Sequence, residues 1–180
     1  MRAGLAFAVL VLGMTSQEAP GEVTDAGPNG FSLVNELTIN GSRAEVWQAA
    51  VDHVGQWWSD DHTISGDAGN MTIEAVPQGC FCEAISDHAG VVHLTVTFVN
   101  PEIILRLTGG LGPLGLLGIN GNMTWEFFDA GEDTRVRFSY VVGGYRPEGL
   151  EDIAEPVDFV IGEALMLLKA HVETNSEDPP

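Results

Sequence analysis

The chain has 180 residues, 44% hydrophobic and 18% charged, a balance typical of one folded domain rather than of a disordered segment. Asp and Glu number 26 against 7 Lys and Arg, which gives a formal net charge of −19 at pH 7. Such a charge repels phosphate backbones and anionic lipid headgroups. The composition therefore argues against nucleic acid as a partner and favours a solvated acidic surface.

The N-terminus has the order of a secretory signal peptide. Arg2 precedes an apolar run from Leu5 to Met14, and small or polar residues follow. The run is about half of the ~20 residues that a membrane-spanning helix needs, so no transmembrane anchor is expected. We expect residues 1–16 to be a signal peptide that directs export to the periplasm or the cell exterior. Residues 17–30, rich in Pro, Gly and acids, are expected to form a flexible leader.

A strand and a helix are predicted next. Residues 31–39 alternate apolar and polar side chains, as a half-buried strand does, and Asn35 falls on the apolar face. Ser42 and Glu45 have the S-x-x-E spacing of a capping box, which predicts a helix start. Gly55 is expected to end this helix.

Six short strands follow, each with one apolar and one mostly polar face, which indicates an antiparallel sheet covered on one side only. They are predicted at residues 71–75, 80–85, 92–98, 103–108, 123–128 and 136–142. A helix from Pro156 to Glu173 carries a wide apolar stripe that would cover the sheet. Residues 174–180 are expected to be a disordered tail.

This order of elements resembles the START-like, or SRPBCC, helix-grip superfamily over residues 31–173. Three stretches carry the resemblance: AEVWQAAVDHVGQWW after the first strand, MTWEFFDAGEDTRVRFSY in the penultimate hairpin, and PVDFVIGEALMLLKAHV in the last helix. The superfamily includes polyketide cyclases, lipid-transfer domains and chaperone-activator homologues. The resemblance implies an α+β fold, with a seven-stranded curved antiparallel sheet wrapped around the C-terminal helix and an apolar ligand between them. The signal peptide departs from the many cytoplasmic members and argues against a chaperone-regulating role.

Cys80 and Cys82, the only cysteines, lie in the second of the six strands. If residues 86–90 form the hairpin loop, Cys82 lies opposite Leu94 and Cys80 opposite Val96. Both thiols then face the apolar side of the sheet.

In the same register His93 lies opposite Glu83 on the other face, away from the thiols. A zinc site would need two more ligands that this neighbourhood does not offer, and a nucleophilic cysteine would need a base on its own face. A disulfide between Cys80 and Cys82 and a pair of reduced thiols in a cavity wall stay as equal alternatives.

Two loops are candidates for contact with a ligand. Residues 108–121 form a long apolar loop that is either a mobile lid bearing Leu111 and Leu114 or a loop tucked over one end of the core. In residues 56–62, one of Trp57 and Trp58 is expected in the core and the other at the cavity entrance. Asp60, Asp61, His62 and Asp67, in this loop and just after it, could bind a metal, but solvated side chains are the favoured interpretation.

The leading hypothesis is an exported, monomeric, non-catalytic protein that binds an apolar small molecule or lipid between sheet and last helix. It needs no metal or cofactor. The side chains expected to contact the ligand are Asn35, Trp57, Trp58, Cys80, Cys82, Leu94, Val96, Leu111, Leu114, Met123, Trp125, Phe138, Tyr140, Phe159 and Leu165. No His, Asp or Glu is expected on any apolar strand face, which argues against acid–base catalysis. The alternatives are a cyclase- or hydrolase-like enzyme using Asn35, Tyr140 or a cavity water, and a protein-interaction module using the acidic surface.

Overall fold

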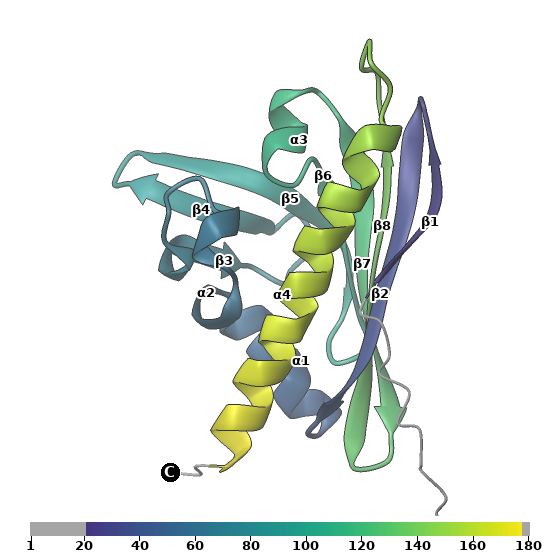
Figure 1. Ribbon diagram of the computed structural model, residues 1–180. Helices are drawn as coiled ribbons and strands as arrows, with labels where there is room; N and C mark the ends of the chain where they lie inside the picture. Colours follow the sequence, from purple (N-terminus) through teal and green to yellow (C-terminus); the bar gives the residue numbers. More distant parts are fainter. Residues whose placement is uncertain (1–20, 178–180) are drawn as a thin grey trace, which may run out of the picture.

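An antiparallel sheet and a long C-terminal helix across one of its faces dominate the computed structural model, which describes residues 21–177 (Figure 1). The sheet has eight strands in the order β1-β2-β8-β7-β6-β5-β4-β3 and is not closed. The strands are β1 (Glu22–Gly27), β2 (Gly30–Asn40), β3 (Met71–Ile73), β4 (Cys80–Ser86), β5 (Ala89–Asn100), β6 (Ile104–Gly109), β7 (Asn120–Ala130) and β8 (Asp133–Gly143). The helices are α1 (Arg43–Asp52), α2 (Val54–Trp57), α3 (Pro113–Leu116) and α4 (Glu151–Glu177), with short 3-10 turns η1 (Asp60–His62) and η2 (Ala68–Asn70). The predicted α+β class and the gripping helix are confirmed, whereas the predicted signal peptide lies outside the described residues.

The eighth strand is β1, at the edge of the sheet, in a segment for which the sequence predicts a flexible leader. It pairs with β2 through a tight turn that brings Gly27 opposite Gly30. Most of its side chains are exposed, so it lacks the alternating apolar pattern by which a strand is recognised. Backbone hydrogen bonds to β2, rather than burial of side chains, hold this strand.

The core lies between α4 and the inward faces of β2, β7 and β8, as the alternation predicts. Asn35 is fully buried on the apolar face of β2, which confirms the position predicted for it. Trp125 of β7 stacks on Phe138 of β8 with ring centroids 4.4 Å apart. These strands run the length of α4 in Figure 1.

The helix that the sequence predicts to end at Gly55 is two helices, α1 and α2, in the structure. The capping box is present, since Ser42 and Glu45 bond each other's backbone N–H groups. However, α1 ends at Asp52, and Gly55 lies inside α2 rather than at a helix end. A Cβ at Gly55 would lie 2.9 Å from the carbonyl oxygen of Ala68, so this position permits close packing of α2 against η2.

Helix α4 is longer than predicted at both ends. It begins at Glu151, five residues before Pro156, and continues to Glu177 through part of the predicted tail. Leu150 and Ala154 are buried against the core. Their packing stabilises a first helical turn before Pro156, whereas the sequence predicts that the helix begins at Pro156.

The β4–β5 hairpin corrects the predicted orientation of the cysteines. The strands are joined by a two-residue turn between Ser86 and Ala89, and their register shifts at two places, between Ala84 and Ser86 and at a bulge between Phe81 and Cys82. Phe81, not a cysteine, lies opposite Leu94, and a one-residue change of register reverses which side chains face the core.

As a result Cys80 and Cys82 are half-buried on the face away from the core, and they form a disulfide with 5.4 Å between their Cα atoms. The hypothesis of two reduced thiols in a cavity wall is therefore wrong. Phe81 and Glu83 face inward, and the bulge allows both His93 and Leu94 of β5 to be buried.

Candidate functional site

The candidate site is a pocket of about 370 Å³ between the first half of α4, the segment around α3, and the residues around η1. Most of its lining is apolar, and its few polar groups come from η1 and from β5. The lining residues are Trp58, Asp61, His62, Thr63, Ile64, His93, Leu111, Gly112, Pro113, Leu114, Leu117, Ile153, Pro156, Val157 and Val160.

The α3 wall is held in place from the core by one tyrosine. The hydroxyl of Tyr140, on β8, donates to the Gly109 carbonyl at 2.9 Å and accepts from the Leu111 N–H at 3.2 Å. Burial raises the pKa of Tyr140, so its hydroxyl stays protonated and can donate. Leu111 and Leu114 are buried beside it, while Leu116 at the end of α3 is 86% exposed.

Trp58 also lines the pocket. Its indole N–H donates to the His62 carbonyl at 3.2 Å, and its ring meets the Phe81 ring edge-on at 5.2 Å between centroids. The neighbouring Trp57 instead donates to the Ala49 carbonyl within the core at 2.9 Å and does not line the pocket.

A buried Glu–His pair lies behind the pocket. Glu83 Oε2 is 2.9 Å from His93 Nε2 and accepts from the Ile64 N–H at 3.0 Å, while Oε1 accepts from the Ser65 N–H. Burial by itself raises the pKa of Glu83, but these hydrogen bonds outweigh it and lower the pKa to about 2. Glu83 is therefore an anion at neutral pH, and it connects the residues after η1 to β5.

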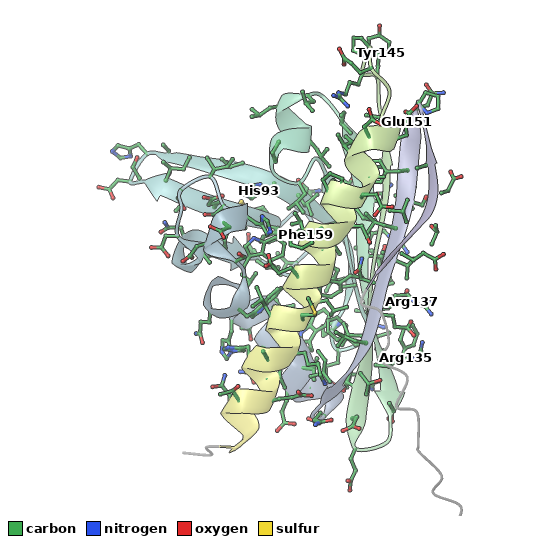
Figure 2. The ribbon with its side chains drawn as sticks, viewed as in Figure 1. His93, Arg135, Arg137, Tyr145, Glu151 and Phe159 are labelled. Atoms are coloured by element: carbon green, nitrogen blue, oxygen red, sulfur yellow. A yellow bond between two sulfur atoms is a disulfide. The ribbon has the colours of Figure 1, made fainter. Side chains whose placement is uncertain are left out.

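His93 also contacts the α3 segment. Its Nδ1 accepts from the Gly112 N–H at 3.3 Å, and both residues line the pocket. Because Glu83 is ionised and can only accept, Nε2 of His93 carries the hydrogen of that bond. Figure 2 shows His93 on the β5 side of α4.

A second His–carboxylate pair joins η1, which lines the pocket, to α4. His62 Nε2 lies 2.8 Å from Glu163 Oε2 of α4, and Asp61 lies beside His62 on η1. Across residues 21–177, no group of three or more His, Cys, Asp or Glu side chains is placed to hold a metal ion. Asp60 instead accepts from the Ala68 N–H at 2.7 Å and so orders the loop.

Of the side chains expected to contact a ligand, only Trp58, Leu111 and Leu114 line this pocket. The cysteines lie on the opposite face of the sheet, and Phe159 is 66% exposed on α4 (Figure 2). The others are buried in the core: Asn35, Trp57, Leu94, Val96, Met123, Trp125, Phe138, Tyr140 and Leu165. Asn35 donates to Asp158 Oδ1 of α4 at 2.8 Å.

The expectation that no carboxylate or histidine faces the core was wrong. Glu83 and His93 do so, with exposures of 1% and 3%. The sequence did pair them across the hairpin, but it placed the pair on the outer face because strict alternation leaves no room for a bulge. The sequence signal that could have indicated this buried pair is an acid and a histidine facing each other in adjacent strands.

The fold defines the class of protein: an α+β helix-grip architecture with an open antiparallel sheet and a C-terminal helix on one face. Three of the solved structures that resemble it illustrate this fold. An uncharacterized protein from Rhizobium leguminosarum has a TM-score of 0.57 at 17% identity, covering 83% of this chain and 97% of that chain. CalU16 from Micromonospora echinospora has a TM-score of 0.52 at 14% identity, covering 79% and 74%. The Aha1 dimer from Colwellia psychrerythraea has a TM-score of 0.52 at 17% identity, covering 78% and 94%.

At these identities the likeness concerns the fold alone. No protein-family model matches the chain. No curated protein matches it either. Within residues 21–177, none of the helices has the length and apolar character required to cross a membrane.

Proposed function

We propose that the protein is an exported member of the SRPBCC helix-grip superfamily that binds a small apolar molecule in the pocket between α4 and α3. The observation that carries the proposal is the pocket itself: about 370 Å³, with a mostly apolar lining. Ligand sites in proteins have volumes of about 300–1,000 Å³ and combine apolar walls with few polar groups.

The pocket differs in place from the site that the resemblance implies. Aromatic residues such as Trp125 and Phe138 fill the space between the middle of the sheet and α4. The remaining volume lies at the first half of α4, where Val157 and Val160 face Leu114 and Leu117 of the α3 segment. Removing a ligand's apolar surface from water against these side chains contributes about 25 cal/mol per Å².

Binding can be tested with the neutral dye N-phenyl-1-naphthylamine, whose fluorescence rises in apolar surroundings. We expect the full chain to bind it with a single saturable site. Val157→Trp places a bulky ring in the pocket wall and should weaken binding at least tenfold. Met166→Trp, on an exposed position of the same helix outside the pocket lining, is the matched control and should leave binding unchanged. Equal binding by the two variants would refute the pocket as the site.

Export is supported by two observations. Residues 1–16 have the order of a signal peptide, and Cys80 and Cys82 form a disulfide, a bond typical of oxidising compartments. Expression with the natural N-terminus and an intact mass measurement test this part of the proposal. A mature chain beginning near Gln17, recovered outside the cytoplasm, would support it, and an uncleaved chain confined to the cytoplasm would refute it.

Acid–base catalysis is a second candidate function, favoured by the Glu83–His93 pair beside the pocket. A carboxylate that orients an imidazole is a common arrangement for a general base. The test is to incubate the protein with the molecule that co-purifies with it and to compare that molecule before and after by mass spectrometry. A chemically changed molecule would favour catalysis over binding alone.

A further inference from the structure

His93 is one of the few polar side chains in the mostly apolar lining of the pocket, and one of its nitrogens is held by a long hydrogen bond. We propose that the ligand is a neutral apolar molecule that carries a hydroxyl group, and that this hydroxyl donates to His93 Nδ1 in place of the Gly112 N–H. The inference rests on the proposed function and specifies the chemical class of its ligand.

The hydrogen bonds of His93 define which nitrogen is available. Nε2 donates to the ionised Glu83 at 2.9 Å, and Nδ1 receives the Gly112 N–H. An N–H group that points at Nδ1 requires a lone pair there, so the imidazole is the neutral tautomer with its hydrogen on Nε2. Nδ1 is therefore an acceptor in the pocket wall, and Glu83 keeps its ring fixed in that orientation.

The Gly112 bond is the one that a ligand can replace. Its length of 3.3 Å is near the upper limit for a hydrogen bond, and it is longer than the 2.9 Å contact of the same ring with Glu83, so it is the weaker of the two. Gly112 is half-buried with a φ of +54° immediately before the four-residue α3, so its N–H can turn to water when displaced. The Glu83 contact, by contrast, is part of a set of three hydrogen bonds and stays in place.

Charge excludes a carboxylate in the ligand. Glu83 contacts His93, Asp61 lines the pocket, and Glu163 lies 2.8 Å from His62, which also lines the pocket. The chain as a whole carries a net charge of −19. An anionic headgroup entering this pocket would meet like charges at short range, whereas a neutral hydroxyl needs only an acceptor.

Three naphthalenes of nearly equal size separate these cases in competition with N-phenyl-1-naphthylamine: 2-naphthol, 2-methoxynaphthalene and 2-naphthoate. We expect 2-naphthol to bind the full chain roughly fivefold to tenfold more tightly than 2-methoxynaphthalene, a ratio that one net hydrogen bond supplies. The anion 2-naphthoate should bind most weakly of the three. His93→Phe should abolish the preference for naphthol, and His88→Phe, in the exposed β4–β5 turn, should retain it.

A measurement on the wild type covers the case in which His93→Phe does not fold. The chain has five histidines, so ¹⁵N spectra of their imidazoles are simple to follow. 2-Naphthol should move the signal of one unprotonated Nδ1, and 2-methoxynaphthalene should not. Equal affinity for naphthol and its ether, with no such movement, would overturn the inference and leave the proposed binding function intact. Failure of the dye and all three naphthalenes to bind would overturn both.

Discussion

Replacement of Glu83 by Gln tests whether the buried Glu–His pair holds the pocket together. The substitution keeps the size of the side chain but removes the negative charge that Ile64, Ser65 and His93 bond. The pKa of this carboxyl is lowered from an ordinary value of 4.5 to about 2. Each pKa unit corresponds to about 1.4 kcal/mol. Compared with the unfolded chain, the folded protein therefore favours the ionised over the protonated carboxyl by about 3 kcal/mol more.

The sign of the pH effect follows from that direction. Because the folded protein binds the proton less readily than the unfolded chain, Glu83 stabilises the fold fully above about pH 4.5, and this contribution falls as the pH approaches 2. By pH 3 about 2 kcal/mol of it is lost. The free energy of unfolding of Glu83→Gln should therefore be about 3 kcal/mol lower than that of the wild type at pH 7, and this difference should narrow by about 2 kcal/mol at pH 3.

Urea unfolding at the two pH values measures both quantities. Glu74→Gln, at an exposed acid just after β3, is the matched control and should change stability by no more than about 0.5 kcal/mol. Taking the difference between variant and wild type removes the effect of the other acids whose pKa is lowered, Glu36 among them. A gap between wild type and Glu83→Gln that stays constant from pH 7 to pH 3 would refute the assigned hydrogen bonds.

Two further predictions concern the α3 wall and the disulfide. Tyr140→Phe removes the hydroxyl that bonds both the Gly109 carbonyl and the Leu111 N–H, so the free energy of unfolding should fall by roughly 1–3 kcal/mol. Tyr145→Phe, at an 83% exposed position, is the control and should leave the free energy of unfolding unchanged. Equal urea midpoints for the two variants would contradict the anchoring role of Tyr140. Reduction of the Cys80–Cys82 bond, which closes a loop of two-residue separation, should lower stability by only about 1–2 kcal/mol. Intact mass should show two alkyl labels after reduction and none before, and labels on the unreduced protein would contradict the bond.

Local patterns in the sequence determined most of the elements. Alternation along β2, β7 and β8 identified their inward faces, including the buried Asn35, and the Ser42–Glu45 pair identified the start of α1. The apolar stripe identified α4 as the helix that covers the sheet. These signals are readable because each depends on residues that are close together in the chain.

The tertiary structure alone decided the site. The two-residue turn and the two register shifts of the β4–β5 hairpin place the cysteines on the outer face and Glu83 and His93 beside the pocket. Strand β1 is held by backbone pairing with β2, and its mostly exposed side chains show no alternating apolar pattern from which the strand could be predicted. Alternation alone leaves the register of a hairpin open, and a shift of one residue reverses both faces. For that reason the sequence could identify a Glu–His pair but could not place it inside the protein.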